Sequence, residues 1–159
     1  MSLRKGAAAA EGDVIDISGD GQLTKKILRA GNGESPPAGG THTMVMHYTG
    51  KLLDGTVFDS SVRRGTPFEF VLGARQVILG WDKGVATMTK GEKAILTCAP
   101  NYAYGSRGAG GVIPPNATLA FEVELIDWKE GGGGGFGSMT TVLVAVLTIY
   151  TAAKLMGFL

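Results

Sequence analysis

The chain has 159 residues, 44% of them hydrophobic and 26 of them glycine, so it can form one domain with a real core and many turns. Its net charge of +1 provides no field that attracts nucleic acid, and we expect no nucleic-acid partner. The chain has two histidines, His42 and His47, and a single cysteine, Cys98. It therefore contains no metal-ligand motif and no internal disulfide, which is typical of a reducing compartment.

Residues 1–13 are expected to form a disordered tail. Arg4 and Lys5 precede a run of alanines, and no apolar segment of the length found in secretory signals follows them. A short transit peptide is the alternative interpretation of this segment.

Short strands are predicted from residue 13 onward by alternating apolar positions. Residues 13–17 indicate an edge strand, and residues 22–31 indicate a second strand that ends at Gly31. Residues 32–40 are rich in proline, glycine and asparagine and predict a loop. The Asp54-Gly55 pair before Phe58 predicts a hairpin turn.

Four later runs alternate clearly enough to separate an inward from an outward face. The outward positions are Val45, His47, Thr49, Glu69 and Val71. Cys98 falls on the inward face, where it is a small core residue rather than a nucleophile. The inward positions are Met44, Met46, Tyr48, Phe68, Phe70, Leu72, Leu96, Cys98, Leu119, Phe121, Val123 and Leu125.

One short helix is predicted where the sequence reads QVILGWDKGV. The residues at the spacing of one helical face are Val77, Ile78, Trp81 and Val85. Gly84 is interpreted as the stop signal of this helix. Gly80 weakens a helix. We therefore expect either that Gly80 and Gly84 let another segment approach closely, or that the indole of Trp81 faces a cavity.

These elements predict an α+β domain over residues 14–130, in which an antiparallel sheet packs its dry face against one helix. Aromatic and polar positions converge on that face: Tyr48, Phe58, Phe68, Trp81, Tyr104 and Phe121, with Asp59 and the glycine-rich loop at 101–119 beside them. An apolar pocket with a few placed polar groups is the arrangement of a ligand-binding site, and a buried indole or phenol requires a partner.

The segments HYTGKLLDGTVFDSS, TPFEFVLG, QVILGWDKGV and YAYGSRGAGGVIPPNATLAFEVEL resemble the FKBP family of peptidyl-prolyl isomerases, the macrolide-binding immunophilins. The similarity extends from Gln22 to Trp128. It implies a twisted antiparallel sheet wrapped around a short α-helix, with Trp81 at the floor of the pocket between them. The substrate and macrolide contacts implied by the resemblance are Tyr48, Phe58, Asp59, Arg64, Phe68, Val77, Ile78, Trp81, Tyr104, Val112, Ile113 and Phe121.

The resemblance also implies roles for these residues. The Ile78 N–H and the Tyr104 hydroxyl hold substrate carbonyls, Asp59 orients or polarises the twisting bond, and Arg64 pairs with Asp59. The implied catalytic set is Tyr48, Asp59, Ile78, Trp81, Tyr104 and Phe121. Two positions depart from the family pattern: Leu79 stands where a basic residue is common, and Ala109 replaces a larger residue of the flap.

The expected function is therefore isomerisation of X–Pro bonds in polypeptides, which assists folding and needs no metal and no cofactor. The expected partners are proline-containing polypeptides and macrolides such as tacrolimus or rapamycin. The alternative is a non-catalytic binding or adaptor module that is tethered to a membrane.

The last part of the chain has a different composition from the domain. Residues 131–138 form a glycine-rich linker. Residues 139–159 are apolar apart from Lys154, and a helix of this length spans about 30 Å, one bilayer core. We expect a tail anchor that leaves the isomerase on the cytoplasmic face of the endoplasmic reticulum or of the mitochondrial outer membrane. The alternatives are an apolar helix that packs on the domain or in a dimer, a soluble cytoplasmic protein, and an engineered C-terminus.

Overall fold

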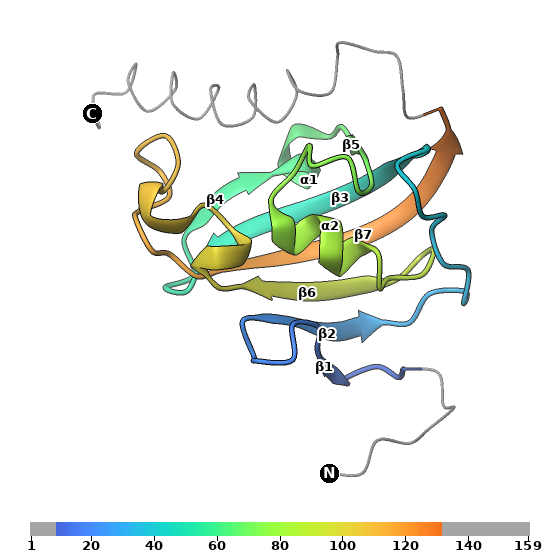
Figure 1. Cartoon of the computed structure of the whole chain (residues 1–159), viewed down its shortest axis with the longest axis horizontal. Coiled ribbons are helices and arrows are strands. Elements are labelled where there is room, and N and C mark those ends of the chain that lie inside the picture. The colour runs from blue at the N-terminus through green and yellow to red at the C-terminus, as the bar shows by residue number, and fades with distance from the viewer. Residues whose placement is uncertain (1–8, 132–159) are drawn as a thin grey trace.

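A long antiparallel sheet organises residues 9–131, the part of the chain that this computed structural model describes (Figure 1). Within that part, seven strands form the sheet in the order β1-β2-β6-β7-β3-β4, and β5 also pairs with β3. The strands are β1 (Val14–Asp16), β2 (Leu23–Arg29), β3 (His42–Leu52), β4 (Val57–Ser60), β5 (Phe68–Val71), β6 (Lys93–Cys98) and β7 (Leu119–Glu130). The predicted antiparallel sheet with a short helix is therefore confirmed.

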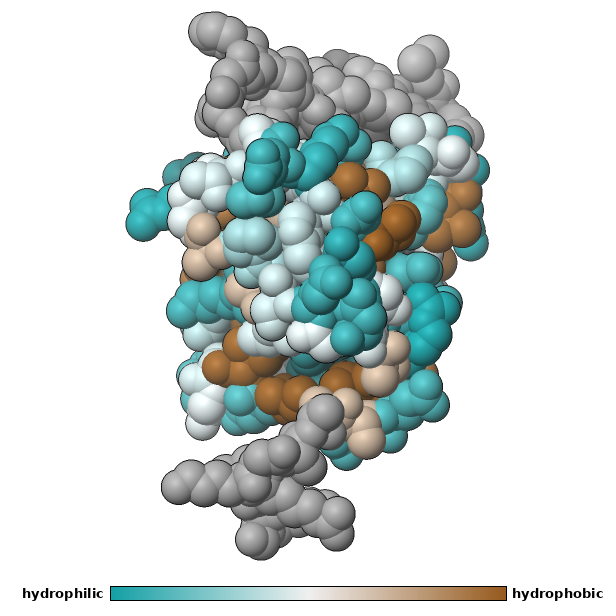
Figure 2. Space-filling view, turned by 90° about the vertical axis from the view of Figure 1, so that its right-hand side faces the viewer, coloured by the Kyte–Doolittle hydropathy of each residue, from teal (hydrophilic) through white to brown (hydrophobic). Residues whose placement is uncertain are grey.

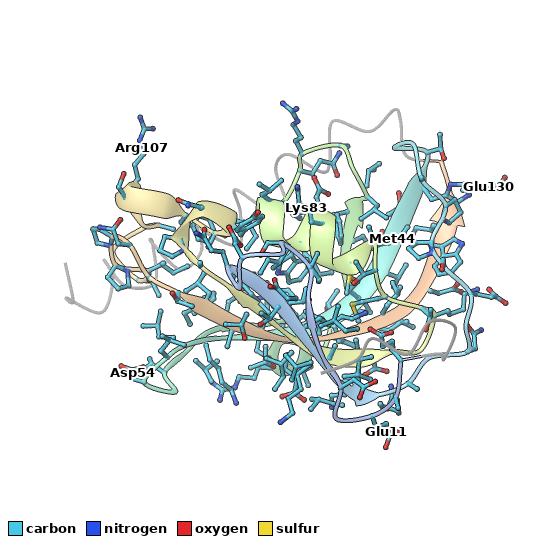
Figure 3. The ribbon with its side chains drawn as sticks, turned by 60° about the horizontal axis from the view of Figure 1, so that its bottom comes forward. Glu11, Met44, Asp54, Lys83, Arg107 and Glu130 are labelled. Atoms are coloured by element: carbon cyan, nitrogen blue, oxygen red, sulfur yellow. The ribbon has the colours of Figure 1, made fainter. Side chains whose placement is uncertain are left out.

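The helical elements are short and lie along the edge or over one face of the sheet. Helix α2 (Leu79–Val85) covers that face, and α1 (Ser61–Arg64) directly follows β4 (Figure 1). Two single 3₁₀ turns, η1 (Pro100–Tyr102) and η2 (Gly105–Arg107), follow β6. Figure 3 shows Arg107 and Glu130 at opposite ends of the molecule, with Met44 in its interior.

The centre of the sheet is the pairing of β3 with β7, because both strands are long and stay in register past one bulge. Tyr48 lies opposite Val123, and Gly50 lies opposite Phe121. All inward positions of the four alternating runs are buried, since a strand turns successive side chains to opposite faces. The predicted inward face is therefore confirmed.

The outward face was predicted correctly at four of five positions. Val45 and Thr49 are half-buried. His47 is half-buried and Glu69 is exposed, whereas Val71 is 4% exposed and belongs to the buried set. Val71 ends β5, where the chain turns toward α2, and its N–H donates to the Gln76 side chain at 2.8 Å. Alternation fails here because Val71 is the last residue of the strand, where the chain turns back and Gln76 bonds to it.

The helix differs from its prediction at both ends. Val77 and Ile78 precede α2, so they do not share a helical face with Trp81. Gly84 is a buried position inside the helix and not its stop signal, since α2 continues to Val85. A Cβ on Gly84 would lie 2.8 Å from the Leu96 Cδ1 of β6, so the absence of a side chain lets the helix approach the sheet. One of the two alternatives for the glycines, close approach, is confirmed.

The surface carries polar groups with small apolar patches between them on the side shown in Figure 2. In the interior, Lys25 and Glu92 form a buried ion pair whose Nζ and Oε2 atoms lie 2.9 Å apart.

None of the helices within residues 9–131 is long and apolar enough to span a membrane. The predicted C-terminal helix at 139–159, and all of the predicted linker except Gly131, lie outside the described residues.

Candidate functional site

Trp81 lies at the centre of a cluster of rings that come from separate strands. Its ring centroid lies 5.0 Å from that of Tyr48, 5.5 Å from that of Phe121 and 5.6 Å from that of Phe68, each in an edge-to-face arrangement. Aromatic quadrupoles favour this geometry. Helix α2 and strands β3, β5 and β7 therefore build one apolar floor, which we call the aromatic floor (Tyr48, Phe68, Trp81 and Phe121).

The indole N–H of Trp81 contradicts the expectation that a buried indole has a hydrogen-bond partner. The side chain is only 4% exposed, and its Nε1 has no hydrogen-bond partner among residues 9–131. A buried donor without a partner costs about 1–3 kcal/mol. Trp81 is therefore held by packing against the neighbouring rings and not by a polar contact.

Half-buried apolar side chains surround the aromatic floor. Phe58, Val77, Ile78 and Tyr104 pack against the core cluster that contains it. Phe58 meets Phe121 edge-on at 5.6 Å, over Gly50, where a Cβ would lie only 2.5 Å from the Phe58 ring. Gly50 thus leaves room for the Phe58 ring to lie across β3.

The flap follows η2 and is closed by a tight pairing of Ala109 with Ile113. The two residues exchange backbone hydrogen bonds of 2.9 and 3.0 Å, and this pairing holds Ile113 at 6% exposure within the core cluster. Val112 is half-buried in the same turn but is not part of the packed cluster. The structure therefore brings together the predicted apolar site residues except Val112.

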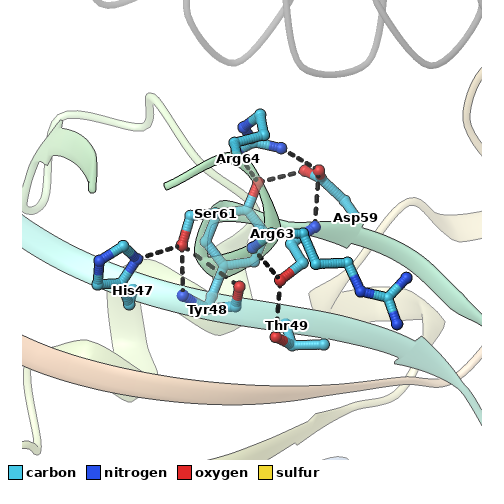
Figure 4. A network of polar contacts seen from close by, with 8 residues as sticks. His47, Tyr48, Thr49, Asp59, Ser61, Arg63 and Arg64 are labelled. Atoms are coloured by element: carbon cyan, nitrogen blue, oxygen red, sulfur yellow. Dashed lines mark hydrogen bonds and ion pairs between the residues drawn. The ribbon is translucent and has the colours of Figure 1, made fainter. Parts of the chain in front are cut away.

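A polar group joins the apolar residues where β3 and β4 meet (Figure 4). The Tyr48 hydroxyl donates to Asp59 Oδ2, and the Arg64 guanidinium pairs with Asp59 Oδ1. Arg64 Nη2 also donates to the Tyr48 oxygen at 3.2 Å. Burial, followed by the bond to Asp59, raises the pKa of Tyr48 far above its ordinary value of 10.0, so the phenol stays protonated.

Ser60 and Ser61 hold this polar group in place, and the sequence analysis missed both. Ser60 caps α1 by accepting from the Arg63 N–H at 3.2 Å. The fully buried Ser61 hydroxyl accepts from the Tyr48 N–H at 2.8 Å and lies 2.9 Å from His47 Nδ1 (Figure 4). The serine pair before Val62 could have indicated the helix cap, because serine favours that position.

Two hydrogen-bond donors beside the aromatic floor have no partner within the described part of the chain. The Ile78 N–H precedes α2 and donates to no acceptor there. The Tyr104 hydroxyl is also unpaired, and burial together with the charge of Asp59 raises the pKa of this phenol. Neither donor is therefore used by the described part of the chain itself.

This arrangement is typical of a class of protein: a domain with a ligand-binding site, in which apolar aromatic side chains lie beside a few hydrogen-bond donors. Within residues 9–131, no group of three or more histidine, cysteine or acidic side chains is placed to hold a metal ion. Cys98 is buried, and burial raises the pKa of its thiol to about 12, so it is not an activated nucleophile.

Comparison with known proteins identifies the family. A family model described as FKBP-type peptidyl-prolyl cis-trans isomerase matches residues 33–126. FK506-binding protein 1 of Dictyostelium discoideum is 60% identical over 103 residues, which are 65% of this chain and 94% of that protein. A peptidyl-prolyl cis-trans isomerase of Schizosaccharomyces pombe is 53% identical over 104 residues, which are 65% of this chain and 92% of the relative.

A longer relative shares the same domain. FK506-binding protein 59 of Drosophila melanogaster is 56% identical over 119 residues, which cover 75% of this chain but 27% of the fly protein. The chain belongs to the FKBP-type peptidyl-prolyl cis-trans isomerase family. The predicted isomerase activity is confirmed by the family match and by relatives that bear this enzyme's name.

Proposed function

We propose that the chain isomerises X–Pro bonds by seating the proline ring on the aromatic floor while Ile78 and Tyr104 hold the neighbouring carbonyls. The observation that supports this mechanism is the pair of unpaired donors beside the floor. A proline ring is apolar and fits a surface of rings, whereas the amide oxygens on either side of it require donors.

Catalysis in such a site needs no nucleophile. The barrier to rotation is about 18–20 kcal/mol, because twisting the bond removes amide resonance. A twisted amide is less dipolar than a planar one, so an apolar surface destabilises the planar form more than the twisted form. Binding that favours the transition state over the ground state is what accelerates a reaction.

Asp59 is the polar group that this mechanism places closest to the twisting bond. Its carboxylate is held by Tyr48 and Arg64 and is 11% exposed, so its direction is set before substrate arrives. We propose that Asp59 orients or polarises the prolyl amide, with Arg64 and Tyr48 as its supports.

Macrolide binding is the second part of the proposal. Several relatives carry the name FK506-binding protein, and the macrolides expected to bind, tacrolimus and rapamycin, would occupy the same floor and the same two donors. Leu79, which is exposed, and Ala109 of the flap depart from the family pattern where outside partners would touch the domain, so the proposal covers macrolide binding and not recruitment of an effector.

The mechanism is tested with the full chain and a short X–Pro peptide, in the presence and absence of rapamycin. We expect faster cis-trans exchange that rapamycin abolishes. The double variant Trp81→Leu with Tyr104→Ala should lose most of the acceleration while remaining folded. Exchange at the parental rate in this variant would overturn the site assignment. Peptide binding without faster exchange would support the adaptor alternative.

We further propose that residues 139–159 attach the chain to a membrane and leave the isomerase on the cytoplasmic side. Support comes from the 21-residue apolar composition of this segment, in which Lys154 is the single charge, and from the free thiol of Cys98, which is typical of a reducing compartment. Cell fractionation with carbonate washing should leave the chain in the membrane pellet. Protease added to intact membranes should then cleave the domain, and recovery of the full chain in the soluble fraction would contradict the proposal.

A further inference from the structure

Asp82 connects helix α2 to the loop that leads into it. One carboxylate oxygen, Oδ1, accepts from the Gly73 N–H at 3.0 Å, and the other, Oδ2, accepts from the Arg75 N–H at 3.1 Å. Asp82 follows Trp81 directly in the first turn of the helix. A side chain next to the aromatic floor therefore holds the loop of residues 72–77, which lies beside α2 (Figure 1).

The loop needs such a partner because its backbone is in an unfavourable conformation. Arg75 has a φ of +57°, in the left-handed region that side-chain-bearing residues rarely adopt. A strained residue of this kind persists only when its surroundings determine its conformation. The bond from Arg75 to Asp82 is one such determinant, and the bond from Val71 to the Gln76 side chain is a second.

The far end of the same segment is also bonded to Asp82. The Asp82 N–H donates to the Ile78 carbonyl at 3.2 Å, and the Trp81 N–H donates to that carbonyl at 3.0 Å. The Asp82 carboxylate therefore holds the connection between β5 and α2 near its start, and the Asp82 backbone bonds to its end at Ile78. Ile78 is the residue at which α2 is capped, and its side chain makes no hydrogen bond there.

We infer that Asp82 is a positioning residue of the isomerase, which sets the direction of the Ile78 N–H toward the substrate carbonyl. This inference rests on the proposed role of Ile78 as a substrate donor. The direction of an amide N–H at the junction of a loop and a helix depends on the conformation of the loop. Asp82 fixes that loop relative to Trp81. The proline on the floor and the donor beside it are thereby kept at a constant separation.

The chain offers a matched control in Asp16. Its carboxylate accepts from the Gly19 N–H and the Gly21 N–H, each at 3.0 Å, one on each oxygen. Asp16 thus closes an exposed loop in the same manner as Asp82, but in the connection between β1 and β2, which contributes no residue to the site. Asp16 Oδ1 also accepts from the Ser18 hydroxyl at 3.2 Å, so Asp16→Ala removes at least as many loop bonds as Asp82→Ala, from a loop that carries no site residue.

The experiment measures kcat and KM for a proline peptide and the amide spectrum of each full-length variant. We expect Asp82→Ala to move the Ile78 amide resonance, speed its hydrogen exchange and raise KM about 10-fold with kcat nearly unchanged, because the lost contact binds ground and transition states alike. Asp82→Asn keeps one acceptor oxygen and should give a smaller rise. Asp16→Ala should alter neither KM nor the Ile78 amide.

The result separates positioning from stability, because partial unfolding removes active molecules and lowers kcat while leaving KM unchanged. That pattern in Asp82→Ala would overturn the inference, and so would an unchanged Ile78 amide. A moved amide with an unchanged KM would overturn the role of Ile78 as substrate donor, and with it the inference that depends on that role.

Discussion

The backbone of Gly80 lies directly against the side chain of Cys98: a Cβ on Gly80 would meet the Cys98 Sγ at 2.5 Å and the Tyr102 carbonyl oxygen at 2.8 Å. This approach seats helix α2 on β6 and η1, and it sets the depth at which Trp81 enters the aromatic floor. One hydrogen atom in place of a methyl group decides how close the helix comes to the sheet.

Gly80→Ala should therefore destabilise the domain, although alanine is the better helix former by about 1 kcal/mol. We expect a loss of about 1–3 kcal/mol, because the added methyl group meets backbone as well as a side chain. Urea denaturation measures it, with Lys83→Ala, on the exposed side of the same helix, as the control. A Gly80→Ala variant as stable as the parent would contradict the packing described for α2.

Tyr104→Phe should separate binding from folding. The hydroxyl has no partner within residues 9–131, so its removal should leave the free energy of unfolding within about 0.5 kcal/mol of the parent. If the hydroxyl holds a substrate carbonyl, kcat/KM should fall about 2–10-fold, the value of one hydrogen bond. Tyr102→Phe, in the neighbouring turn, is the matched control and should change neither quantity. Equal activity in both variants would remove Tyr104 from the site.

The activity should be flat across mildly acidic to mildly basic pH. His47 lies on the other face of β3 from Tyr48, against Ser61, and His42 is at the start of that strand, so no histidine contacts the aromatic floor. Acid–base catalysis would produce a bell-shaped dependence of kcat/KM on pH. A bell centred near neutrality, with circular dichroism unchanged throughout, would refute catalysis by apolar binding.

Stability should fall at alkaline pH because of Cys98. Burial raises the pKa of its thiol from 9.0 to about 12, so the folded protein retains a proton that the unfolded chain releases above pH 9. The unfolded state then binds fewer protons, and each pH unit between these values costs up to about 1.4 kcal/mol. Denaturation at pH 8 to 11 measures the slope. Cys98→Ala should flatten the slope between pH 9 and 10, below the ordinary pKa of the phenols, and an equally steep slope there in that variant would contradict the role of Cys98.

The buried ion pair of Lys25 and Glu92 should be costly to break from one side. The Lys25 ammonium also donates to the Thr87 carbonyl at 2.8 Å, and both side chains are almost completely buried. Lys25→Ala leaves the Glu92 carboxylate without its cation and should destabilise by about 3–5 kcal/mol. The double variant Lys25→Met with Glu92→Leu removes both charges and should recover most of that loss in thermal unfolding. A double variant worse than Lys25→Ala would show that the pair itself stabilises the fold.

Alternation in the sequence predicted the faces of the strands well, because successive residues of a strand must point to opposite sides. In β2, Lys25 shares the buried face with Leu23 and Ile27, a position at which the apolar pattern did not predict a lysine. The local pattern could not predict the ion-pair partner of Lys25, because Glu92 is distant in sequence and meets Lys25 only when β2 pairs with β6. Val71 and Gly84 were misassigned for a related reason: each lies where a regular element meets another segment.

The sequence by itself determined the strands, the apolar face, the set of rings and the family, because these depend on periodicity and on residue types in order. Only the tertiary structure decided which polar groups remain free and which are paired. Among residues 9–131, the Ile78 N–H has no acceptor and the Asp82 carboxylate has two donors, because of how β5, its loop and α2 pack together. A hydrogen bond depends on distance and direction between segments, and neither quantity is written in the local pattern of residues.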